Sequence, residues 1–148
     1  MRIIDYFSED SVMFINSEDK HEVLSLMVAQ AAKLGFIPNE EEFKNSIFER
    51  ESIMSTDMGW QVAIPHAKLD DIPKFFVIPA ILSKKSDWGA GNKQTVNLVF
   101  LIGGPAGSQT DYLKILSKVT LVVRNANRRK AILKAKTAQE VLAQFAGL

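Results

Sequence analysis

The chain of 148 residues contains no cysteine and only two histidines. Without cysteine it has no disulfide, no thiolate nucleophile and no cysteine-ligated zinc, and this composition is compatible with a reducing cytoplasm. The formal net charge is only +1. A broad surface for nucleic acid or for an acidic membrane is therefore not expected.

Long apolar segments are also missing. The longest apolar runs, near residues 75–82 and 96–102, are too short to span a bilayer. The first ten residues, MRIIDYFSED, contain acids and lack the long apolar core of a signal peptide. We therefore expect a cytoplasmic protein without direct membrane insertion.

Several catalytic signatures are absent as well. The chain has no G-x-S-x-G nucleophile motif and no G-x-x-x-x-G-K-[ST] phosphate loop. Asp70 and Asp71 follow His66, but no second histidine is near and the two-histidine spacing of a helical zinc site is missing. No metal site is expected, and the glycine-rich stretch 103–107 is interpreted as a turn after a strand.

What is present indicates a single α/β domain over residues 1–148, because no linker or repeat interrupts the chain. Helices are predicted after Asn16 or Ser17, from Asn39 to residues 50–52, from about Thr110, and after Thr137. Apolar runs predict strands at 12–15, 61–64, 75–82 and 95–102, with a turn at 83–94. The alternation favours a central, mostly parallel or mixed sheet of about five strands with helices on both faces.

The stretch GWQVAIPHAK, residues 59–68, contains the histidine of most interest. Pro65 fixes its own φ and pushes Ile64 into the extended region, so the strand cannot simply run on and His66 should sit at a strand end. Ligands bind at such ends in open α/β sheets. From these residues alone, His66 is a general base, a metal ligand, a phosphoryl acceptor or a structural group.

Polar residues upstream of His66 fit a phosphate site. Arg50 lies at a predicted helix end, where its guanidinium can hold a phosphate through two parallel hydrogen bonds. Ser55 and Thr56 offer hydroxyl groups, and Gly59 allows close approach of the backbone. The alternatives are a solvated helix charge at Arg50 and simple turn roles for the two hydroxyls.

The order of these motifs resembles the enzyme IIA domain of the fructose–mannitol class of the bacterial phosphotransferase system, over nearly the whole chain. That family has an E-R-E-like helix end, an S-T pair, a G-N-G-aliphatic-A-aliphatic-P-H-G segment, a D-[WF]-G-A-like turn, a V-x-L-V-F-L-I-like strand and two closing helices. The matching segments here are 49–51, 55–56, 62–66, 87–90, 96–102, 113–117 and 137–142.

The resemblance implies a phosphoryl-transfer function without a cofactor. His66 would accept a phosphoryl group, usually on Nε2, from a small phosphocarrier of the HPr type and pass it to a cysteine of an enzyme IIB domain. The ring must be neutral to attack, and its other nitrogen should donate to a fixed acceptor. Arg50 and backbone amides of the 55–60 loop are the expected phosphoryl ligands.

The chain departs from the family pattern at three places. Trp60-Gln61 stands where Asn-Gly is usual, and Ala67 replaces the glycine after the histidine. Trp60 is expected to pack into the domain, with a partner-docking surface as the alternative. Mannitol-type members have a second histidine where this chain has Tyr112, which can donate a hydrogen bond but cannot be cationic at neutral pH. The role of the second histidine is therefore absent here, or Tyr112 partly substitutes for it. The other histidine, His21, is expected to be an exposed surface residue.

Two other functions remain open at this stage. A nitrogen-regulatory branch of the family is phosphorylated at the same histidine but binds regulatory target proteins. A degenerate domain, in which Trp60 blocks the site, is the third hypothesis. A basic cluster is interpreted as favourable charge at a helix end rather than a nucleic-acid surface, since no aromatic residue is interleaved with it. It comprises Arg124, Arg128, Arg129 and Lys130.

Overall fold

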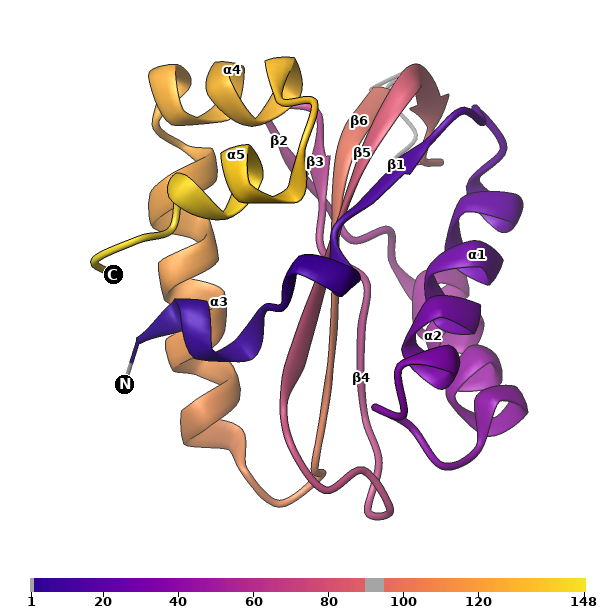
Figure 1. Ribbon diagram of the computed structural model, residues 1–148. Helices are drawn as coiled ribbons and strands as arrows, with labels where there is room; N and C mark the ends of the chain where they lie inside the picture. The colour runs from indigo at the N-terminus through magenta and orange to yellow at the C-terminus, as the bar shows by residue number, and fades with distance from the viewer. Residues whose placement is uncertain (1, 90–94) are drawn as a thin grey trace.

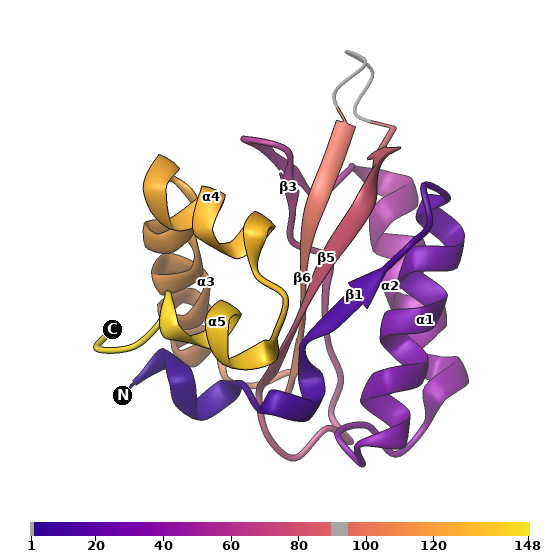
Figure 2. The ribbon, with the colours of Figure 1, turned by 45° about the horizontal axis from the view of Figure 1, so that its top comes forward.

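The computed structural model describes residues 2–89 and 95–148 and has the expected α/β architecture, with one mixed sheet between two helical layers. Helices α1 (Lys20–Lys33) and α2 (Glu40–Ile53) cover one face, and α3 (Gln109–Val123), α4 (Ala126–Lys134) and α5 (Ala138–Ala143) cover the other, as Figure 1 and Figure 2 both show. None of the helices in this described part of the chain combines the length and apolarity that a bilayer crossing requires.

The sheet has six strands within the described residues, joined in the order β1-β5-β6-β3-β2, with β4 also paired to β6. Its core is the antiparallel pair of β5 and β6, while β1, β3 and β4 pair in parallel with their neighbours and β2 is antiparallel to β3. The mixed sheet predicted from the sequence is therefore confirmed. The strands are β1 Met13–Ile15, β2 Asp57–Gly59, β3 Val62–Ala63, β4 His66–Lys68, β5 Phe76–Asp87 and β6 Thr95–Gly104.

Both faces of the β5–β6 pair are buried. Ile78 and Leu101 contribute to the core under α1 and α2, whereas Val77 and Ile102 contribute to the core under α3, α4 and α5. Burial on both faces explains why these strands appear in the sequence as continuous apolar runs. Two of the predicted loops, at residues 83–94 and 103–107, are corrected by the extent of these strands.

The first correction is that β5 extends to Asp87, since Ser86 and Asp87 pair with β6 beyond a register shift; residues 90–94 of the predicted turn lie outside the described part of the chain. The second is that Gly103 and Gly104 belong to β6 instead of a turn. A Cβ at either glycine would overlap the ring of Phe76 or Phe75. Glycine is therefore required there for close packing rather than for chain reversal.

Side chains next to the helix ends cap α1 and α2. The predicted cap is correct for α2 and wrong for α1. Asn39 caps α2 by accepting from the Glu42 amide at 3.0 Å, as expected. For α1 the cap is Asp19, which accepts from the His21 amide at 2.9 Å, and neither Asn16 nor Ser17. Ser17 instead turns the chain before the helix, because its hydroxyl accepts from the Asp19 amide.

The helices predicted in the C-terminal part of the chain are also present. The long helix ends at Val123, and α4 begins after Asn125, which accepts from the Arg128 amide. Thr137 caps α5 through the Glu140 amide. Arg129 donates to the Val123 carbonyl at 2.5 Å, which agrees with the interpretation of the basic cluster as charge at a helix end. Two short 3-10 helices, Ile3–Tyr6 and Glu9–Ser11, precede β1.

Candidate functional site

His66 begins β4, directly after the chain leaves β3. β3 ends at Ala63, and β4 then pairs in parallel with β6 through His66 and Ile102. Pro65 lies in the gap between the two strands, where its missing N–H leaves no strand hydrogen bond unmade. The prediction of a strand boundary is confirmed, with His66 opening the next strand. Ala67 is buried in the core under α1 and α2, so His66 faces the opposite side, where its ring lies 5.3 Å from that of Tyr112 on α3.

The local backbone fixes the tautomer of the half-buried His66 ring. Its Nδ1 lies 2.9 Å from the carbonyl oxygen of Ile64. A carbonyl can only accept, so Nδ1 carries the proton and Nε2 keeps its lone pair. Burial is the largest cause lowering the pKa of His66; the Ile64 carbonyl and Glu51 oppose this shift, and the charges of Arg50 and Lys68 add to it. The ring is therefore a neutral nucleophile at pH 7.

A shallow pocket of about 260 Å³ opens beside this ring. It brings together the end of α2, the strand β2, the start of β4 and one side of α3. Of the residues predicted from the sequence, His66, Arg50, Thr56 and Tyr112 line it. The remaining lining residues are Asp57, Met58, Ile64, Leu116 and Thr120.

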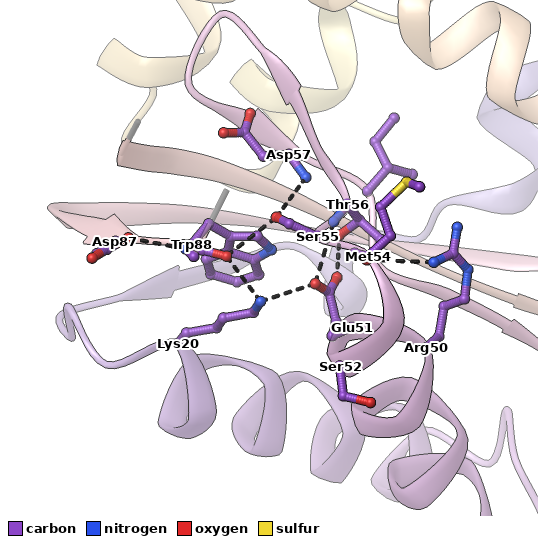
Figure 3. Close-up of polar contacts among 12 residues, drawn as sticks. Lys20, Arg50, Glu51, Ser52, Met54, Ser55, Thr56, Asp57, Asp87 and Trp88 are labelled. Atoms are coloured by element: carbon purple, nitrogen blue, oxygen red, sulfur yellow. Dashed lines mark hydrogen bonds and ion pairs between the residues drawn. The ribbon is translucent and has the colours of Figure 1, made fainter. Parts of the chain in front are cut away.

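Arg50 lies in the last turn of α2, half-buried at the edge of the pocket. Its Nη1 donates to the Met54 carbonyl at 3.3 Å, which is visible in Figure 3. A guanidinium has five N–H donors, and within the described residues this is the one hydrogen bond it makes to the protein. The remaining donors are available to an anion in the pocket.

Behind the pocket, a buried carboxylate ties α1, α2 and the following loop together. Glu51 is 8% exposed, and its Oε2 lies 2.9 Å from the Nζ of Lys20 on α1. The same carboxylate accepts hydrogen bonds from both the amide and the hydroxyl of Thr56, as Figure 3 shows. A buried ion pair needs such extra hydrogen bonds to offset its desolvation.

The two hydroxyls singled out in the sequence belong to this network. The Ser55 hydroxyl donates to the Trp88 carbonyl at 3.2 Å and accepts from the Asp57 amide at 3.3 Å. Lys20 donates to the same Trp88 carbonyl at 3.0 Å. The structure thus engages Ser55 and Thr56 in holding the loop that follows Arg50 (Figure 3), and their hydroxyls are already committed to protein partners.

The largest departure from the family pattern, Trp60-Gln61, lies in the turn of the hairpin between β2 and β3. Gly59 pairs with Val62, and the two residues between them, Trp60 and Gln61, have φ angles of 55° and 64°. Two successive positive φ values define a turn that favours Asn-Gly, so Trp and Gln are held there under strain. The Gln61 carbonyl anchors the turn by accepting from the amides of Asn97 and Leu98.

The Trp60 side chain is 47% exposed, so the expectation that it packs into the domain is wrong. Val62 pairs with Leu98 and His66 with Ile102, four residues apart on β6, which corresponds to about 13 Å. Trp60 lies beyond Val62 and does not line the pocket. The hypothesis of a site blocked by Trp60 therefore has no support in the structure.

Lys68 does not line the pocket but contacts Tyr112, which does, and the sequence analysis did not single it out. It lies two residues after His66 on β4, and its ammonium is 4.8 Å from the centre of the Tyr112 ring, with a hydrogen bond to Gln109. Residues i and i+2 of a strand lie on one face, so the spacing of His66 and Lys68 could have placed them together. By contrast, the roles of Glu51 and Lys20 left no local signal, because 31 positions separate them.

The second histidine is remote from this chemistry. His21 is exposed near the start of α1, as predicted, and stacks on Phe48 with ring centres 4.4 Å apart. In residues 2–89 and 95–148, no group of three or more His, Asp or Glu side chains is arranged to hold a metal ion.

The chain is similar to known proteins over nearly its whole length. The chain is 30% identical over 147 residues to a nitrogen regulatory protein of Bradyrhizobium diazoefficiens, covering 99% of this chain and 95% of that protein. It is 31% identical to the mannitol-specific phosphotransferase enzyme IIA component of Geobacillus stearothermophilus, with 90% of each covered.

The fold matches that of enzyme IIA from Escherichia coli, solved in complex with phosphorylated enzyme IIB of the mannitol system. The TM-score is 0.83 at 18% identity, over 96% of this chain and 99% of that one. Residues 5–147 also match the family model for EIIA 2 of the phosphoenolpyruvate-dependent sugar phosphotransferase system. A neutral, tautomerically fixed histidine in an open pocket thus occurs in a chain that belongs to the EIIA 2 family of the phosphoenolpyruvate-dependent sugar phosphotransferase system.

Proposed function

We propose that this protein is a phosphoryl carrier in which Nε2 of His66 accepts a phosphoryl group from an HPr-type phosphocarrier and passes it to a cysteine of an enzyme IIB. The observation that carries the proposal is the 2.9 Å contact between His66 Nδ1 and the Ile64 carbonyl, beside the pocket that Arg50 lines. Residues 1–148 act as one domain in this role, which belongs in the cytoplasm, where phosphoenolpyruvate is the source of the phosphoryl group.

The chemistry follows from the tautomer. The Nε2 lone pair attacks phosphorus, the Nε2–P bond forms, and the bond between phosphorus and the donor breaks with its electron pair returning to the donor. The Nδ1 proton stays on the ring because the Ile64 carbonyl holds it. Transfer to the IIB cysteine reverses these events, with the thiolate as the attacking group, and the protein ends in its starting state.

Arg50 is the residue we assign to stabilising the transferred group. Its free N–H donors face the pocket that also contains His66. Positioned cationic donors stabilise the charge spread over the equatorial oxygens during phosphoryl transfer. Thr56 and Ser55 support this arrangement indirectly, since they hold the loop that follows Arg50.

Exposed apolar side chains that lie close in sequence to the pocket residues Arg50 and Tyr112 provide a docking surface for the donor and the acceptor in turn. Ile53 and Met54, at the end of α2, are 74% and 65% exposed, and Leu113 next to Tyr112 is also exposed. Large exposed apolar side chains that cluster beside a reactive group are typical of a protein-binding surface. The fold match to an enzyme IIA solved with its IIB partner supports this assignment.

The test is phosphorylation by phosphoenolpyruvate, enzyme I and HPr, with detection of an acid-labile phosphate. We expect the label on His66, and its loss in His66→Ala. The matched control is His21→Ala, which removes the other histidine, on a different face, and should leave labelling intact. Full labelling of His66→Ala would overturn the proposal.

A second role has one specific observation in its favour, namely the similarity over 99% of the chain to a nitrogen regulatory protein. In that role phosphorylation of His66 would change which regulatory target protein binds around the pocket. Pull-downs with the phosphorylated and unphosphorylated forms separate the two functions. Recovery of an enzyme IIB alone in both forms would exclude the regulatory role.

A further inference from the structure

Lys68 shares one face of β4 with His66. The strand contains only His66, Ala67 and Lys68, and Ala67 is buried on the other side. His66 and Lys68 therefore both point toward α3, where each is in contact with the ring of Tyr112. The reactive imidazole and the lysine ammonium are neighbours joined through a single aromatic ring.

The position of the Lys68 ammonium is held from two directions. It lies over the Tyr112 ring, 4.8 Å from its centre, and donates a hydrogen bond to Oε1 of Gln109 in the first turn of α3. Both partners are neutral, because burial raises the pKa of Tyr112 above its ordinary value and glutamine does not ionise. Lys68 therefore has no anionic partner in these contacts, and its positive charge is uncompensated by them.

A phosphoryl group on His66 would carry more negative charge than Arg50 alone can neutralise. A phosphoryl group bound to a side chain carries nearly two negative charges at neutral pH, whereas Arg50 supplies one positive charge from the α2 side of the pocket. Tyr112 supplies none. Lys68 approaches from the α3 side, and the charges of both Arg50 and Lys68 act on the His66 ring.

We propose that Lys68 is a catalytic residue of the phosphoryl site, whose ammonium moves from the Tyr112 ring to an oxygen of the phosphoryl group on His66 and balances Arg50 across it. The proposal rests on the phosphoryl-carrier function proposed above. In this movement the ammonium leaves two neutral partners, Tyr112 and Gln109, for a doubly charged anion. The movement is favoured because hydrogen bonds to ionised acceptors are the stronger ones. The flexible four-carbon stem of lysine permits it.

The test compares Lys68→Met, which keeps the apolar stem, with Lys68→Arg, which keeps the charge. We expect Lys68→Met to slow phosphoryl transfer from HPr to His66 by about 10- to 100-fold, and Lys68→Arg to recover most of the rate. Lys74→Met, at an exposed lysine outside the pocket, is the matched control and should transfer at the wild-type rate.

A second measurement does not depend on HPr. The folded protein is phosphorylated with the small donor phosphoramidate, and the phosphoryl group on His66 is titrated by phosphorus NMR. Loss of a nearby cation destabilises the dianion, so Lys68→Met should raise the phosphoryl pKa, and Lys74→Met should not. In the unphosphorylated protein, the same change should move the pKa of His66 upward, toward its ordinary value.

The outcomes separate the two proposals. If HPr fails to label the wild type while phosphoramidate labels His66 and the Lys68→Met shift appears, the carrier function fails and the role of Lys68 stands. An unchanged phosphoryl pKa together with a transfer rate within twofold of wild type overturns the role of Lys68 and leaves a packing contact with Tyr112. Failure of phosphoramidate to label folded protein also overturns it, because the proposal requires an accessible Nε2.

Discussion

The Nδ1 of His66 lies 2.9 Å from the carbonyl oxygen of Ile64, with Pro65 between the two residues. The proline fixes its own φ and restricts Ile64 before it, so the acceptor for the ring proton is supplied by the same short segment that carries the ring. The chain therefore sets the tautomer of the His66 ring locally, with an acceptor from the same segment.

The first prediction concerns pH. Because the pKa of His66 is lowered, chiefly by burial, phosphorylation should stay constant around pH 7 and decline only as the pH falls below the ordinary histidine value of about 6.5. Rapid-quench labelling across pH 5 to 8 measures this. A rate that already drops by half above that value would contradict the lowered pKa.

The same shift affects stability. In the window below the ordinary value, the unfolded chain binds a proton at His66 more readily than the folded chain does, so the free energy of unfolding should fall as the pH drops through it. Urea titrations of wild type and His66→Gln over this window give the comparison, and the glutamine variant should have the flatter dependence.

The second prediction is that Arg50→Gln lowers the rate of phosphorylation by about 10²-fold, because the pocket loses its guanidinium donors. Arg50→Lys should recover only part of this, since lysine lacks the planar pair of donors. Single-turnover transfer from phosphorylated HPr is the measurement. Equal rates for the lysine variant and wild type would show that charge alone suffices at this position.

The third prediction concerns the pair of Lys20 and Glu51. Glu51→Gln should lower the free energy of unfolding by about 3 kcal/mol, because it leaves a partly buried ammonium without its counter-charge. Asp5→Asn removes the partner of Arg2 in an exposed pair and should cost less than about 1 kcal/mol. Urea unfolding of the two variants makes the comparison.

A double-mutant cycle with Lys20→Met isolates the interaction within the buried pair. The coupling should be favourable, and Glu51→Gln should also slow phosphorylation, because Thr56 is held by the same carboxylate beside the pocket. Additive effects of the two substitutions on unfolding would contradict the ion pair.

The fourth prediction concerns the strained turn. Trp60→Asn should raise the free energy of unfolding by roughly 0.5–1 kcal/mol, since asparagine tolerates the positive φ of 55° better than tryptophan. Trp60→Ala is the control, because it removes the exposed ring without improving the fit to this φ. Phosphorylation by HPr should be unchanged in both, as Trp60 lies outside the pocket.

A selective loss of binding to one partner in Trp60→Ala, with labelling of His66 intact, would assign the exposed ring to partner choice. Faster labelling in either variant would instead show that Trp60 obstructs the pocket, contrary to the position of the hairpin on the sheet.

Features that depend on neighbouring residues could be predicted from the amino-acid sequence. Asn39 and Thr137 cap their helices through amides three residues on, and Pro65 lies between β3 and β4. Such interactions are written within a few positions of the chain, so their residue types and spacing are enough to predict them.

Features that depend on contacts between distant segments could not be predicted in this way and emerged from the fold. The antiparallel pairing of β5 with β6, the exposure of Trp60, the ion pair of Lys20 with Glu51 and the position of Lys68 over Tyr112 are all of this kind. Local sequence spacing does not predict which distant side chain a residue will contact, because such contacts depend on how the helices pack on the sheet. The sequence pointed to His66, and the packing of distant segments determines which charged side chains lie around it.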